Sequence, residues 1–108
     1  MSANPWSESI TLGSSGTAVN LFAAIQALDV TVKYPQCCKI QIQLDPGAGG
    51  AKLFGGNSDV SSTNHGWEIV AGQIKNWEAL QQNLYNLQQI WLVSDTSEVK
   101  VNVEFVIH

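Results

Sequence analysis

Residues 98–107 read EVKVNVEFVI, and this stretch decides the fold class. Apolar and polar residues alternate along it, so that one face carries Val99, Val101, Val103, Phe105 and Ile107, and the other carries Lys100, Asn102 and Glu104. Successive side chains of a strand point to opposite faces, and this period therefore predicts a strand with one buried face. Residues 38–44, CKIQIQL, have the same period, with an expected inner face of Cys38, Ile40, Ile42 and Leu44 and an outer face of Lys39, Gln41 and Gln43.

Further strands are shorter and are separated by turn-forming residues. The stretch IWLV, residues 90–93, is apolar on both faces, which indicates a central strand or one whose outer side another chain covers. Weaker strands are expected within 7–13, 51–56 and 67–72. Turns rich in Gly, Pro, Asp or Asn are expected at 13–16, 45–50, 55–59, 64–66 and 95–97. This pattern predicts an all-β, single-domain antiparallel β-sandwich over residues 10–108, of jelly-roll or Ig-like type, with at most one short helix.

Two segments fit a helix and a strand almost equally well. Residues 18–30 carry apolar side chains at both helical and alternating spacing, and they stay undecided between the two. Residues 76–87 place Trp77, Leu80, Leu84 and Leu87 on one helical stripe. For this second segment a strand through 73–77 is favoured, followed by an irregular or one-turn helical link.

The polar N-terminus is expected to be an extended arm over residues 1–9. Its large apolar side chain, Trp6, follows Pro5 and has no apolar neighbour before Ile10. An arm of this composition is typical of a tail that orders on a neighbouring subunit. Trp6 is therefore a candidate interface residue, and so is Trp91, which lies in the strand that another chain would cover.

The charge content bears on the class of partner. Only 13% of the residues are charged, the net charge is −4 and the sequence pI is near 4.8. Without a basic cluster to neutralise phosphates, nucleic acid binding is not expected. No apolar run reaches the ~18 residues of a membrane span, and the first residues, MSANPWSESI, do not predict a signal peptide. A weakly charged surface rich in amides and hydroxyls suits permanent contact with other chains.

The sequence predicts no catalytic residue, cofactor site or metal site. His65 lies in a turn and His108 is the last residue, so no metal-binding spacing exists. The adjacent cysteines, Cys37 and Cys38, are expected to be reduced, with one in the core. The oxygen-rich residues 57–64 are a calcium candidate with one carboxylate, and the favoured alternative is a turn capped by Asn57 or Asp59. If two of the four tryptophans shared an exposed face, sugar binding would be an alternative function.

Residues 51–107 resemble a family of small structural virion proteins of tailed bacteriophages. The resemblance lies in a strand, the turn GGNSDV with SSTNHG, a strand ending in Ala71-Gly72, and the final NLQQIWLVSDTSEVKVNVEFVI. It implies a β-sandwich and a capsid decoration, or cement, protein that has no enzyme activity. It also implies that 52–69 is a structural hairpin, with Phe54 and Val60 pointing inward and a polar tip pointing outward.

From this resemblance we expect a protein located in the virion and made in the host cytoplasm. Its expected partners are the major capsid protein or other virion proteins, and it is expected to form a homo-oligomer, preferably a trimer. A tail or head-to-tail connector component is the alternative within this class. A small carbohydrate-binding module is the alternative from another class.

Overall fold

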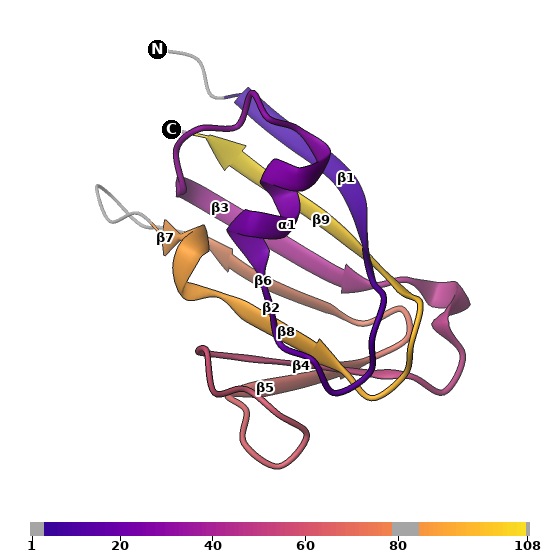
Figure 1. Ribbon diagram of the computed structural model, residues 1–108. Coiled ribbons are helices and arrows are strands. Elements are labelled where there is room, and N and C mark those ends of the chain that lie inside the picture. The colour runs from indigo at the N-terminus through magenta and orange to yellow at the C-terminus, as the bar shows by residue number, and fades with distance from the viewer. Residues whose placement is uncertain (1–3, 79–84, 108) are drawn as a thin grey trace.

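The computed structural model describes residues 4–78 and 85–107, which form two antiparallel sheets packed face to face (Figure 1). We call them the first and the second sheet. The first sheet has the order β1 (Asn4–Leu12), β9 (Val99–Ile107), β3 (Gln36–Leu44) and β6 (Ile74–Glu78), and β7 (Tyr85–Asn86) also pairs with β3. The second sheet has the order β2 (Val19–Asn20), β8 (Trp91–Ser94), β4 (Lys52–Gly56) and β5 (Trp67–Val70). The expected β-sandwich is thereby confirmed.

The strand order decides between the two expected sandwich types. When the two-residue β7 is left aside, the strands pair from the ends of the chain inward. β1 pairs with β9, β2 with β8, β3 with β6 and β4 with β5. Successive pairs fall alternately into the first and the second sheet. This arrangement of eight strands is that of a jelly roll rather than of an Ig-like sandwich.

The long strand β9 is the centre of the first sheet. It pairs with β1 from Asn4↔Ile107 to Leu12↔Val99, and with β3 on its other side. The predicted inner face is confirmed for Val99, Val101, Val103 and Phe105, whose side chains are at most 3% exposed. Burial of several large apolar side chains, each worth about 1.5–3 kcal/mol, makes this strand a main source of stability.

The strand β3 corrects one detail of the predicted inner face. The side chain of Cys37 is buried and that of Cys38 is half-buried, the reverse of what strict alternation from Ile40 predicts. The register shifts between Cys37, which lies opposite Ile107, and Lys39, which lies opposite Val106. Cys38 is thus the extra residue of a β-bulge, which moves the alternation by one position.

The undecided segment 18–30 contains both a strand and a helix. The two-residue β2 is followed by the helix α1 (Leu21–Leu28), and Asn20 caps the helix by accepting a hydrogen bond from the Ala23 N–H at 3.1 Å. Leu21, Phe22 and Ile25 are buried against the core. None of the helices in the described ranges is long and apolar enough to cross a membrane.

The favoured strand through 73–77 is confirmed as β6, which ends at Glu78. The link expected after it falls mostly on residues 79–84, which lie outside the described residues. Two short 3-10 helices, η1 (Pro46–Ala48) and η2 (Leu87–Gln89), connect other strands.

The N-terminal residues differ from the expected arm. From Asn4 onward they belong to β1 and pair with β9 along its length, so that no boundary separates residues 4–9 from the sandwich. The reason is that β9 extends beyond the part needed to pair with the apolar residues Ile10 and Leu12, and its free edge accepts the polar residues as well.

Candidate functional site

The outer face of the second sheet carries a small apolar cluster of its own. Phe54 and Val93 point away from the main core, yet each is at most 5% exposed, as is Val60. The loop 57–66, which joins β4 to β5, folds back over this face and supplies Val60. Phe54 and Val60 are buried, but the expected inward direction is wrong, because both lie in this second cluster and not between the sheets.

The polar side chains of the loop 57–66 hydrogen bond to its own backbone. Asn57 Oδ1 accepts a bond from the Asp59 N–H at 3.0 Å, as the turn interpretation predicted. Ser61 Oγ accepts bonds from the N–H groups of Thr63 and Asn64 at 3.3 and 3.1 Å. Within residues 4–78 and 85–107, no group of three or more His, Cys, Asp or Glu side chains is placed to hold a metal ion. Of the oxygens proposed for calcium, those of Asn57 and Ser61 thus accept hydrogen bonds from the backbone of the loop.

His65 fastens this loop to the sheet. Its ring lies 4.6 Å from the Phe54 ring, and its Nδ1 is 3.1 Å from the Ser61 carbonyl oxygen. A carbonyl only accepts, so Nδ1 carries the proton and donates. Nε2 is 3.7 Å from Glu68 Oε1, and Lys52 Nζ is 3.6 Å from Glu68 Oε2. These contacts assign His65 a structural role.

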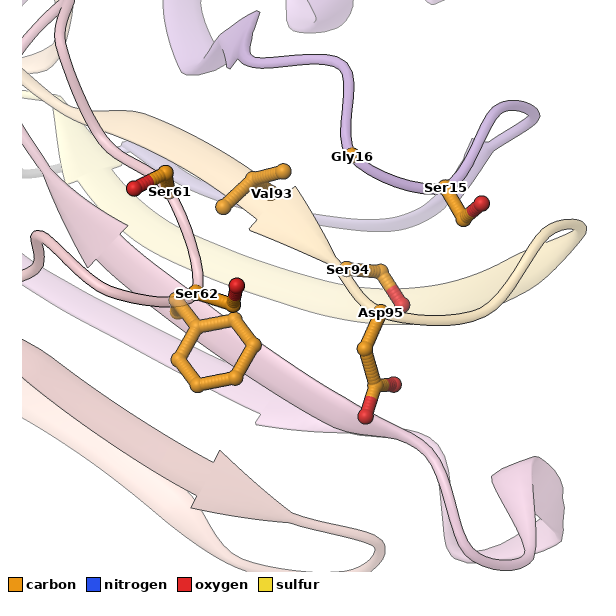
Figure 2. A pocket seen from close by; sticks show the side chains of 8 residues that line it. Ser15, Gly16, Ser61, Ser62, Val93, Ser94 and Asp95 are labelled. Carbon is orange, nitrogen blue, oxygen red and sulfur yellow. The ribbon is translucent and has the colours of Figure 1, made fainter.

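A pocket of about 350 Å³ opens beside this cluster (Figure 2). Phe54 and Val93 contribute its apolar surface, and its other lining residues are Ser15, Gly16, Ser61, Ser62, Ser94 and Asp95. A serine nucleophile needs a base, and the carboxylate in this lining is that of Asp95. The Lys52 N–H donates to Asp95 Oδ1 at 2.8 Å and, as the main cause, lowers the pKa of Asp95. This bond gives the Asp95 carboxylate a backbone partner within the folded chain.

The middle of the outer face of the first sheet carries a network of polar side chains, and the exposed Lys39, Lys100 and Glu104 lie on the same face. Ser9 donates a hydrogen bond to Asn102 Oδ1 at 2.7 Å, and Asn102 Nδ2 donates to Gln43 Oε1 and Asp45 Oδ1, each at 3.2 Å. Gln43 in turn donates to the Gly72 carbonyl at 3.3 Å. The bond from Asn102 is the main cause that lowers the pKa of Asp45. We call the surface formed by Ser7, Ser9, Gln41, Gln43 and Asn102 the amide face.

Trp6, a predicted interface residue, has partners within its own chain. Its ring stacks on Phe105 with the ring centroids 5.0 Å apart, and its Nε1–H donates to Asp29 Oδ2 at 3.1 Å. The premise that nothing local buries Trp6 is therefore wrong, because β1 brings it opposite Phe105. The ring remains half-buried. Its role at an interface stays a prediction.

The other tryptophans lie elsewhere on the sandwich. Trp91, the second predicted interface residue, is half-buried and packs against the Phe54 cluster. Trp67 of β5 and Trp77 of β6 meet edge to face at 5.8 Å, where the rims of the two sheets approach each other. Thus Trp6, Trp91 and the Trp67–Trp77 pair occupy three different places. Trp67 and Trp77 are half-buried and pack against the main core, and sugar binding stays an alternative prediction.

Sequence reasoning missed two charged residues at the ends of the first sheet. Glu8 lies in β1 opposite the buried Val103, and Lys75 lies in β6 opposite the buried Ile42. Residues directly opposite each other share a face, so both charges are on the core-facing side of their strands. Extending the alternation of Ile10 and Leu12 by one step toward the N-terminus would have found Glu8.

Among large apolar side chains, those of Leu28, Val30, Tyr34, Val70 and Ile74 are exposed.

No protein-family model and no curated protein sequence matches the chain. One similar solved structure is a virus-like particle of the extra small virus of the giant freshwater prawn Macrobrachium rosenbergii, with 12% identity, coverage of 100% of this chain and 81% of that chain, and a TM-score of 0.39. Another comes from Bacillus endospore appendages, which form disulfide-linked pili, with 9% identity, coverage of 99% and 88%, and a TM-score of 0.36. Likeness at this level carries no argument about function.

Proposed function

We propose that this chain is a non-enzymatic structural protein of a virus particle, specifically a homo-oligomeric decoration protein on the capsid of a tailed phage. The observation that carries the proposal is the amide face. Ser9, Asn102 and Gln43 form a chain of neutral hydrogen bonds across three strands, on a protein with 13% charged residues. Such a face is held rigid before contact and exerts little charge repulsion on a neighbour.

The two outer faces also suggest which one lies on the particle. The second sheet covers its apolar outer side chains with its own loop 57–66, whereas Ser7 and Ser9 of the amide face are exposed. The amide face is therefore the surface we assign to the capsid shell. The phage origin rests on the resemblance of residues 51–107 to small virion proteins, and a trimer is the preferred assembly.

Copy counting by quantitative mass spectrometry of purified particles tests this proposal. Hundreds of copies per particle are expected for a decoration protein. A count in the single digits or teens would instead assign the chain to the tail or the head-to-tail connector. Absence from the particles, together with binding of the monomer on a glycan array, would replace the proposal by the carbohydrate-binding function.

A further inference from the structure

The two end strands of the first sheet carry opposite charges that have no ionic partner. The ion pairs within the described residues involve Lys52, His65 and Glu68, and thus neither Glu8 nor Lys75. The Glu8 side chain is exposed, and Lys75 Nζ lies 5.4 Å from the centre of the Trp77 ring. Charges that point to the core side of an edge strand are a common means of blocking pairing with another edge. Here the two edges are blocked by opposite signs.

The strand directions allow these two edges to meet in a second copy. Three antiparallel pairings separate β1 from β6 across the sheet, so β6 runs opposite to β1. A second copy placed beside the first in the same orientation therefore brings its β1 antiparallel to β6 of the first copy. The core-facing side of one sheet then continues into the core-facing side of the next.

In one register of this contact, both pairs of core-facing side chains lie opposite favourable partners. If Glu8 of one copy lies opposite Lys75 of the other, antiparallel pairing also places Trp6 opposite Trp77 and Ser7 opposite Asn76. Opposite charges and aromatic pairs at directly opposed positions both stabilise a sheet. Each of the two tryptophans is half-buried within its own chain and has surface left to contribute.

The same charges disfavour the competing edge contacts. Pairing of β1 with β1 of another copy would bring two Glu8 carboxylates close together. Pairing of β6 with β6 would bring two Lys75 ammonium groups close together, and like charges at such positions destabilise a sheet. The second sheet offers weaker alternatives. Its end strand β2 has two residues, and Glu68 in its other end strand β5 already contacts Lys52 and His65.

We propose that copies of this chain join edge to edge, with β6 of one copy paired to β1 of the next through Glu8–Lys75 and Trp6–Trp77 contacts. This inference deepens the homo-oligomer of the proposed function and rests on it. A contact between two different surfaces repeats from copy to copy, and it generates a closed ring where the rotation closes. The preferred trimer is such a ring when each copy is also rotated about an axis parallel to the strands, which keeps β1 antiparallel to β6.

Charge reversal tests the contact. Glu8→Lys and Lys75→Glu should each weaken self-association about tenfold, measured by analytical ultracentrifugation, because an attractive pair becomes a repulsive one. The double variant should recover the wild-type association. Glu104→Lys and Lys39→Glu are matched controls on the outer side of the sheet and should leave association unchanged. Equal weakening by the controls, or no recovery in the double variant, would overturn the inference.

A cross-link tests the register independently. Ser7→Cys in one chain and Asn76→Cys in another should form a disulfide-linked dimer on oxidation, since directly opposed residues lie about 4.5–5.5 Å apart between Cα atoms. Gln41→Cys, in the middle of the sheet, replaces Asn76→Cys as the control and should give no such product. Failure to cross-link, both in solution and on particles that contain the chain at high copy, would refute the inference and leave the proposed function intact. If the chain cross-links but is absent from particles, the edge-to-edge contact is supported and the proposed function is refuted.

Discussion

Phe54 on the second sheet and Gln41 on the first both point away from the space between the sheets, but their surroundings differ. Phe54 is 5% exposed because the loop 57–66 and Trp91 cover it. Gln41 is half-buried and lies beside the polar side chains of Ser7, Gln43 and Asn102 and the carboxylate of Glu104. The difference shows that an outward position in a sandwich is not necessarily a solvent position. One face is closed by the chain itself, and the other is the face that we propose lies against the particle.

The largest effect is expected where the closed face is opened. Phe54→Ala should lower the free energy of unfolding by about 3–5 kcal/mol, the usual cost of removing a buried aromatic ring. The matched change on the open face, Gln41→Ala, should cost less than about 1 kcal/mol. Urea denaturation of both variants measures the difference. Equal costs would show that the loop does not bury Phe54 as described.

A smaller effect is expected at Gly55, which lies beside Phe54 and opposite Trp67. A Cβ at this position would come within 2.1 Å of the Trp67 ring. Gly55→Ala should therefore destabilise the fold by about 1–3 kcal/mol, as overpacking does, and should weaken the Trp67–Trp77 contact. Gly50→Ala is the control, since a Cβ there meets nothing within 4 Å. The thermal midpoints of the two variants, with tryptophan fluorescence, report the outcome, and equal midpoints would contradict it.

Acid should lower the free energy of unfolding through one carboxylate beside each face, by smaller amounts than the substitutions above. Hydrogen bonds lower the pKa of Asp45 beside the amide face and that of Asp95 beside the pocket below the ordinary value of 3.8. A carboxylate whose pKa is lowered in the folded state stabilises that state at a pH above the ordinary pKa. This contribution is lost as the pH falls through the lowered pKa. Asp45→Asn and Asp95→Asn should therefore be less stable than the wild type at neutral pH, and their stability should approach that of the wild type as the pH falls below the ordinary pKa of 3.8. A stability gap that is independent of pH would contradict this assignment.

The sequence predicted the parts of the fold that depend on local alternation. The faces of β9 and most of β3 follow from a period of two, and β-rich segments separated by turns predicted the sandwich. The bulge at Cys38 was missed because an extra residue in one strand leaves no mark until its partner strand is known. Burial raises the pKa of the Cys37 thiol to about 12, with a further contribution from Cys38, which shows that Cys37 is the core residue of the pair.

The surroundings of the candidate site residues could not be predicted for a related reason. Trp6 packs on Phe105 and bonds to Asp29, residues far away in the sequence that the fold brings beside it. Phe54 was expected to point inward, but it lies on the outer face of its sheet, where a loop folded over it buries it. Both outcomes depend on long-range packing. The interface roles of Trp6 and Trp91 remain predictions.

Lysine labelling tests most directly whether the amide face, and not the second sheet, lies against the particle. Lys39 and Lys100 are on the outer side of the first sheet, and Lys52 is on the outer side of the second, with all three exposed in the free chain. Acylation of free protein and of intact particles, followed by mass spectrometry, gives the protection at each site. The account predicts strong protection of Lys39 and Lys100 on particles and unchanged labelling of Lys52. Protection of Lys52 alone would contradict it.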